Sequence, residues 1–139
     1  MAIIALNSDK PTVDQRGYGF GSMHKDNLGF VANTSEAIQY VSAPCAGKLK
    51  NVTVMADVTS DATKTYTVTV TNKNNSDAAM LGTTLYDADP ILTAGTAAEA
   101  SLSATAANLA VDKGDVIAVS MTGGTGSGNV GILLEWESA

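Results

Sequence analysis

The sequence predicts an all-β fold: an antiparallel eight-stranded β-sandwich of the jelly-roll type with an extended N-terminal arm. About eight short apolar stretches follow residue 35, and turn signals separate them every 8–12 residues or so. Some of these stretches alternate strictly between apolar and polar residues, as half-buried strands do. Charged residues make up only 16% of the 139-residue chain and aromatic residues 5%. This composition excludes a long-helix protein and a disordered chain.

The chain is expected to contain one folded domain at residues 36–139 and an arm at residues 1–35. The arm shows neither helical periodicity nor sustained alternation, although a short strand could form at Leu28–Ala32. Its glycines permit unusual backbone angles. Aromatic residues stand between them, so the arm is expected to lie on something rather than hang free. The glycines are Gly17, Gly19, Gly21 and Gly29.

The first strands of the domain are separated by clear turns. Glu36–Ser42 is predicted to be a strand that stops at a turn containing Pro44. Lys48–Val58 is the second strand, and the change of apolar phase between its residues 49 and 52 predicts a bulge or twist there. Lys64–Asn72 has the clearest alternation and predicts one buried and one wet face. Its apolar side consists of Tyr66, Val68 and Val70.

The second half of the domain is harder to divide. Ala78–Tyr86 could form a strand, and the Ala-rich residues 93–108 could form a short helix. The many Ser and Thr residues there favour strands at Glu99–Ala104 and Leu109–Val111 instead. Asp115–Thr122 is almost continuously apolar, which predicts a strand covered on both faces. The closing strand, Asn129–Glu137, places Val130, Ile132, Leu134 and Trp136 on one face, and Trp136 is expected in the core.

This strand count is typical of a jelly roll, with a seven-stranded immunoglobulin-like sandwich as the alternative. The single cysteine, Cys45, cannot form a disulfide within the chain. No apolar run approaches the length of a membrane span, and the N-terminus does not read as a secretory signal. The formal net charge of −6 argues against nucleic acid as a partner. We therefore expect synthesis in the cytoplasm and no nucleic-acid or membrane partner.

No residue pattern predicts an active site. The glycine-rich residues 123–128 precede a strand and lack the lysine of a phosphate-binding loop. His24 is the only histidine, and Cys45 has no helix N-terminus or adjacent cation to activate it. Acidic residues that could hold calcium or serve a glycosidase match no known spacing. We therefore expect no catalytic residue, metal, cofactor or small-molecule substrate, and no enzyme activity. Those acidic residues are Asp77, Asp87, Asp89 and Glu99.

The arm supplies the candidate contact residues. Its aromatic residues lie where no core strand is evident, so they either contact a partner or fold back on the sandwich. The candidates for contact with a partner protein or with another subunit are Arg16, Tyr18, Phe20, Met23 and Phe30.

Several segments from residue 38 to the end of the chain form a recognisable pattern. They are Ile38-Gln-Tyr-Val-Ser-Ala-Pro44, Ala46-Gly-Lys-Leu-Lys-Asn-Val52, the Thr-rich residues 65–71, Leu92-Thr-Ala-Gly95, Val111-Asp-Lys-Gly-Asp-Val-Ile-Ala-Val119 and the alternating last strand. With these segments, the chain resembles small jelly-roll decoration (cement) proteins of bacteriophage heads and related head-fibre modules.

The resemblance implies a structural virion protein that binds the outside of a phage capsid and stabilises the head. Its implied partners are the major capsid protein and further copies of itself in a homotrimer. Its implied location is the outer capsid surface, after synthesis in the host cytoplasm. Two alternatives remain. A carbohydrate- or receptor-binding module would place aromatic residues on its loops, and residues 59–63, 72–77 and 123–128 contain none. A pilus-like or adhesin subunit of a bacterial surface would need a secretion signal.

Overall fold

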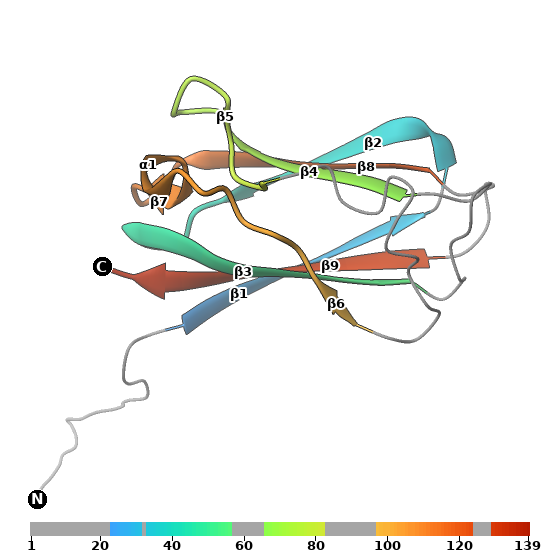
Figure 1. Cartoon of the computed structure of the whole chain (residues 1–139), viewed down its shortest axis with the longest axis horizontal. Coiled ribbons are helices and arrows are strands. Elements are labelled where there is room, and N and C mark those ends of the chain that lie inside the picture. The colour runs from blue at the N-terminus through green and yellow to red at the C-terminus, as the bar shows by residue number, and fades with distance from the viewer. Residues whose placement is uncertain (1–22, 32, 57–65, 83–96, 124–128) are drawn as a thin grey trace, which may run out of the picture.

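A computed structural model describes residues 23–31, 33–56, 66–82, 97–123 and 129–139 of the chain. The strands form two antiparallel sheets that face each other, called here the upper and lower sheets after their places in Figure 1. The upper sheet contains β2 (Asn33–Ser42), β8 (Val116–Gly123), β4 (Tyr66–Asn72) and β5 (Ala78–Ala79), in that order. The lower sheet contains β1 (Met23–Val31), β9 (Asn129–Ser138), β3 (Gly47–Ala56), β6 (Ala98–Glu99) and β7 (Ala110–Val111), and a single short helix α1 (Ala106–Leu109) precedes β7.

The strand pairing confirms the predicted jelly-roll class of β-sandwich. Both β6 and β7 pair with β3, so we count them as one interrupted strand of an eight-stranded fold. With that grouping, the first strand pairs with the last, the second with the last but one, and so inwards to β4 with β5. Such a ladder, rolled up so that β9 also pairs with β3 and β8 with β4, is the double-sheet jelly roll.

The prediction that residues 23–35 belong to an arm is wrong. β1 begins at Met23 and pairs with β9 along its whole length, and β2 begins at Asn33. The alternation in β1 is hidden in the sequence because an inward position is held by a carboxylate, Asp26, which shares a register position with Leu134. Residues 1–22 lie outside the described part of the chain.

Most of the remaining strand predictions are confirmed in their centres, but the strand predicted at Glu99–Ala104 is wrong beyond Glu99, where β6 ends. β4 alternates between buried and more exposed positions as predicted. The register of β3 against β9 shifts between Leu49 and Asn51, where a bulge was predicted. The prediction that the strand at 115–122 is covered on both faces is wrong, because Val116 is 40% exposed and Ala118 is only partly buried. One face of β8 packs inwards, and the other is the outer surface of the upper sheet.

The core lies between the sheets and is almost entirely aliphatic. Trp136 is fully buried, as predicted, and it is the largest buried side chain. Its Nε1 donates a hydrogen bond to Oδ2 of Asp26 at 2.8 Å. This bond satisfies the polar atom of a side chain that is otherwise surrounded by the core, and it ties the edge strand β1 to β9.

We expect Asp26→Ala to lower the free energy of unfolding by about 1–3 kcal/mol, because the buried indole N–H loses its acceptor. The matched control is Lys25→Ala on the same strand. Lys25 pairs with Glu135 at 3.4 Å on the surface, so its loss should cost less than about 1 kcal/mol. Urea unfolding followed by the fluorescence of Trp136 measures both. Equal losses of unfolding free energy in the two variants would show that the buried hydrogen bond stabilises the fold no more than the surface ion pair does.

Candidate interaction surface

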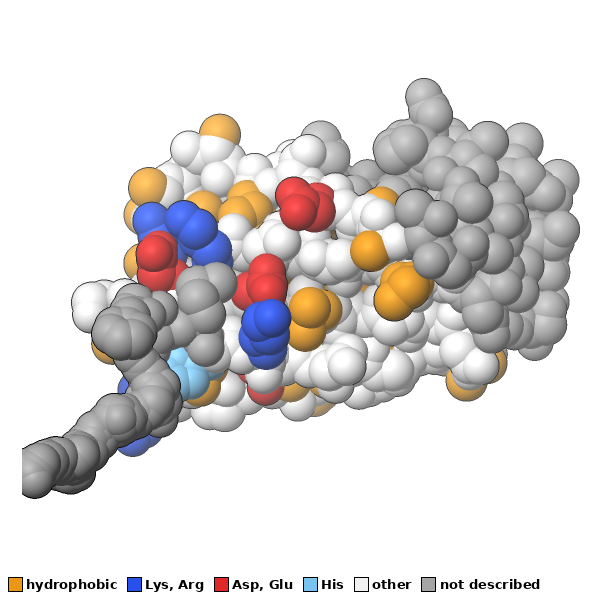
Figure 2. All heavy atoms as spheres, turned by 90° about the horizontal axis from the view of Figure 1, so that it is seen from below, with side chains coloured by type: hydrophobic (Ala, Val, Ile, Leu, Met, Phe, Trp, Pro, Cys, Tyr) orange, Lys and Arg blue, Asp and Glu red, His pale blue; other side chains and the backbone are white. Residues whose placement is uncertain are grey.

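The two outer faces of the sandwich differ in charge. The outer face of the lower sheet carries ion pairs near the C-terminus, where Lys25 lies 3.4 Å from Glu135 and Glu137 lies 3.6 Å from Lys48 and 3.8 Å from Lys50. Figure 2 looks onto this side of the molecule, and its blue and red side chains gather toward one end of the described surface. This face is therefore charged, and these five residues form ion pairs with one another.

The outer face of the upper sheet carries no charged side chain over residues 38–42 of β2, 116–120 of β8 and 69–71 of β4. Residues that stand opposite each other in neighbouring strands project from the same side of the sheet. Tyr40, Ala118 and Thr71 therefore form one outward row, because Ala118 pairs with both of the others. Three such rows make up a surface that we call the uncharged face, which consists of Ile38, Tyr40, Ser42, Thr69, Thr71, Val116, Ala118 and Ser120.

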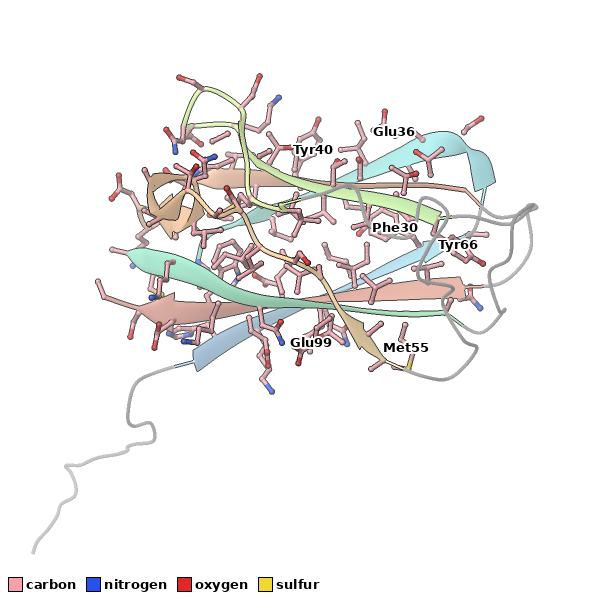
Figure 3. All side chains as sticks on the ribbon, in the orientation of Figure 1. Phe30, Glu36, Tyr40, Met55, Tyr66 and Glu99 are labelled. Carbon is pink, nitrogen blue, oxygen red and sulfur yellow. The ribbon has the colours of Figure 1, made fainter. Side chains whose placement is uncertain are left out.

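Large apolar side chains are exposed on the uncharged face. Of the five large hydrophobic residues that the described part of the chain exposes, three belong to it: Tyr40 (62%), Ile38 (48%) and Val116 (40%). Figure 3 shows Tyr40 above the upper sheet, whereas Phe30 and Tyr66 lie between the sheets. Exposed apolar groups that cluster in this way mark contact surfaces more often than scattered ones do.

The β4 side of the uncharged face consists of short hydroxyl side chains. The hydroxyl groups of Thr69 and Ser120 form a hydrogen bond, and Ser120 is buried. Short threonine and serine side chains have little rotamer freedom to lose when a partner covers them. Contact on this side of the face therefore costs little side-chain entropy.

Charged groups lie just beyond one end of the uncharged face. Lys73 follows β4 and its Nζ lies 2.8 Å from Oδ1 of Asp77. The hydrogen bond to Asp77 and the charge of that carboxylate raise the pKa of the Lys73 ammonium. At the other end, Glu36 projects outwards from the start of β2 (Figure 3). An apolar centre with charged ends is the arrangement of a protein contact surface with a polar rim.

The turn between β4 and β5 is fixed by a network of polar side chains. Asn72 is fully buried, and its Nδ2 donates to Oδ2 of Asp115 at 3.1 Å. Its Oδ1 accepts from the amide of Asn74 at 2.9 Å, and Oδ1 of Asn74 accepts from the amide of Val116 at 2.7 Å. A hollow of about 250 Å³ lies beside these residues. Because these polar groups already hold one another, we assign the network to loop positioning and not to ligand binding.

The sequence-predicted contact residues are separated by the structure. Arg16, Tyr18 and Phe20 lie outside the described residues. Met23 starts β1 opposite Glu137. Phe30 is only 4% exposed and belongs to the core, so it does not contact a partner. It faces inwards because β1 is a strand of the sandwich and Phe30 shares its register position with Val130 of the core.

Sequence reasoning missed the uncharged face, although a signal for it exists. The segment Glu36–Ser42 has apolar residues on both of its sides: Ala37 and Val41 face inwards, whereas Ile38 and Tyr40 face outwards. A strand in a sheet with one packed face needs only one apolar side. The second apolar side was the available indication of a contact surface.

The residues singled out for other chemistry do not come together where they are described. Asp77 lies in the turn after β4, whereas Glu99 is on the lower sheet (Figure 3), and Asp87 and Asp89 lie outside the described residues. Cys45 has a free thiol in the turn between β2 and β3. Within the described ranges, no three His, Cys, Asp or Glu side chains group as metal ligands would. None of the helices described there has the length and apolar character to cross a membrane.

We expect the free energy of unfolding of the double variant Ile38→Ser/Tyr40→Ser to lie within about 1 kcal/mol of the wild-type value, because both side chains are largely exposed. The contrasting variant is Tyr66→Ser, which truncates a buried aromatic side chain and should cost about 3–5 kcal/mol. Chemical denaturation of the three proteins measures these differences. A large loss in the double variant would mean that Ile38 and Tyr40 stabilise the fold and are not held for a partner.

Comparisons with known proteins give structural similarities only. No protein-family model matches the sequence, and no curated protein matches it significantly. Among solved structures, a chain of the cyanophage Pam1 capsid asymmetric unit is 16% identical, with a TM-score of 0.47 over 88% of this chain and 90% of that one. A chain from the disulfide-linked pili of Bacillus endospore appendages is 12% identical, with a TM-score of 0.34 over 85% and 88%. At these TM-scores, neither similarity assigns a role to this chain.

Proposed function

We propose that this chain is a structural virion protein that binds the outside of a phage capsid and stabilises the head. The proposal begins from the sequence resemblance to phage decoration proteins, which implies a jelly-roll sandwich, and the fold agrees with that implication. The observation that carries it is the uncharged face, on which Tyr40, Ile38 and Val116 are exposed without a described partner.

The uncharged face has the properties that a protein partner needs. Interface cores are depleted of charged residues and enriched in aromatic ones, and Tyr40 with its neighbours fits that composition. Desolvating Thr, Ser and Ala side chains costs less than desolvating Lys or Glu. The charged face of the lower sheet would then remain in water and keep the outside of the particle soluble.

The proposed partners are the major capsid protein and further copies of this chain. The homotrimer and the position on the outer capsid surface follow from the resemblance to decoration proteins, and both remain part of the proposal. A structural role of this kind requires no catalytic group, metal or cofactor.

A carbohydrate- or receptor-binding module is the second candidate, and the exposure of Tyr40 favours it. A flat aromatic ring that is 62% exposed can stack against a sugar ring, as aromatic platforms of sugar-binding proteins do. Binding of the purified protein to glycans on an array, without binding to capsids, would support this alternative over capsid decoration.

The uncharged face can be tested in a capsid-binding experiment. We expect Val116→Lys, in the central strand β8, to reduce binding to purified phage heads that lack this protein by at least about tenfold, because a desolvated ammonium finds no partner in the contact. The matched control is Met55→Lys on the outer face of the lower sheet, where Met55 is 46% exposed. Co-sedimentation with heads, read by gel, measures both. Equal binding by the wild type and both variants would exclude the uncharged face as the capsid contact.

The arm residues form a separate prediction. We expect the triple variant Arg16→Ala/Tyr18→Ala/Phe20→Ala to keep the free energy of unfolding of the wild type. It should bind heads more weakly, since aromatic and arginine side chains are the usual anchors of contacts. A deletion as far as residue 35 would not test this idea, because it would remove β1. Co-sedimentation at the same protein concentrations makes the measurement. Unchanged binding would remove these three residues from the contact.

A further inference from the structure

We propose that two copies of this chain pair edge to edge through β2, antiparallel about a two-fold axis at Tyr40. The pairing would join their upper sheets into one continuous sheet. The occupant of the β2 edge is thus a second copy of the same strand. This inference concerns the isolated protein and does not depend on the proposed capsid function.

The backbone of β2 offers hydrogen-bonding groups at an open edge. Among the described strands, β2 pairs only with β8. The amide of Ala43, next after β2, donates to the carbonyl of Asp115 at 2.8 Å, so it points toward the β8 side. Amide directions alternate along a strand. Counting back from Ala43, the residues whose amides point toward the open edge are Ile38, Tyr40 and Ser42.

From Ala37 to Ser42 this edge lacks the features that protect sheet edges, because Glu36 and the irregularity in register both lie before Ala37. Natural edge strands carry charges, especially Lys, or Pro. The other long edge strand, β1, carries Lys25 and Asp26, and its Gly29 carbonyl accepts a hydrogen bond from the Gln39 side chain. In β2, by contrast, the regular stretch from Ala37 to Ser42 contains no charge and no proline.

The sequence of β2 selects the register of the pairing. The three edge-facing residues are spaced evenly about Tyr40, so a two-fold axis there places Ile38 opposite Ser42 of the second copy. Each of the three opposed pairs exchanges two backbone hydrogen bonds. The two Tyr40 rings meet on the outer face, where an aromatic pair adds stability. Glu36 falls outside the paired stretch, so the two Glu36 carboxylates lie at opposite ends of the contact and do not repel each other closely.

Charge and area together indicate a weak dimer. The chain carries a net charge of −6, and copies of such a protein repel each other least where they meet at an uncharged stretch, such as Ala37–Ser42 of β2. The paired stretch is only about 17 Å long, so the contact buries far less than the roughly 800 Å² per partner of a stable interface. We expect a dissociation constant on the order of 100 µM.

The contact is isologous, so it closes on two copies and is distinct from any three-fold contact. A chain that made both contacts would connect trimers to one another. Copies that are held side by side on a surface would be concentrated enough to pair even through a weak contact.

Sedimentation equilibrium of the full chain from about 10 µM to about 1 mM, a range that brackets the expected dissociation constant, tests the proposal. The mass should rise to twice that of the smallest species. Over the same range, amide exchange should slow at residues 38, 40 and 42. Tyr40→Pro removes an edge-facing amide, which an edge strand tolerates, and should abolish the rise.

A second variant and a control keep the result interpretable. Ile38→Lys adds the charge that protects natural edges and should raise the dissociation constant at least about tenfold. Val31→Lys replaces an exposed aliphatic side chain of β1 (59% exposed, against 48% for Ile38) and should leave dimerisation unchanged. A mass that stays constant up to about 1 mM, or an equal effect of Val31→Lys and Ile38→Lys, would overturn the proposal. Because no capsid is present, this outcome is separate from that of the head-binding experiments.

Discussion

The pairing of β9 with both β1 and β3 is the constraint on which the rest of the structure depends. This one strand, at the end of the chain, aligns residue by residue with the first described strand and with the third. Its inward side supplies Val130, Ile132, Leu134 and Trp136 to the core. The two pairings join residues between 74 and 114 positions apart in the chain, so the loop-closure entropy must be offset by this burial. Until β9 is in place, the lower sheet has no centre and the upper sheet has no surface to pack on.

Close approach of backbones limits the sequence at one end of this arrangement. Gly47 begins β3 beside the end of β9, and a Cβ at this position would overlap the carbonyl of Glu137. Glycine there permits β3 to pair with β7 and β9 at once. Two residues later the register shifts, between Leu49 and Asn51. The extra residue at the shift keeps both Leu49 and Val52 in the core, opposite Trp136 and Leu134 of β9.

The parts of the fold that could be predicted from the sequence are those where one physical rule acts alone. The alternation of β4 and β9 could be read directly, because one face is buried and the other is wet. The strand β1 could not, because the inward Asp26 is polar, and only the partner indole of Trp136 explains it. Outward Tyr40 was equally hidden, since an apolar residue in a strand is read as core unless the pairing register shows which side it takes.

The low charge content of the chain reflects a sandwich in which only one of the two sheets carries many charged side chains. Most charged side chains of the described strands lie on the lower sheet, where Lys25, Lys48 and Lys50 pair with Glu135 and Glu137. On the upper sheet, Thr and Ser keep the outer face wettable without adding charge. Such a face stays hydrated in the free protein, yet its short hydroxyl side chains need little free energy to desolvate when a flat partner covers them. A surface of Lys and Glu would be more soluble but harder to bury. The composition is therefore consistent with a sandwich that keeps one sheet for solvent and the other for contact.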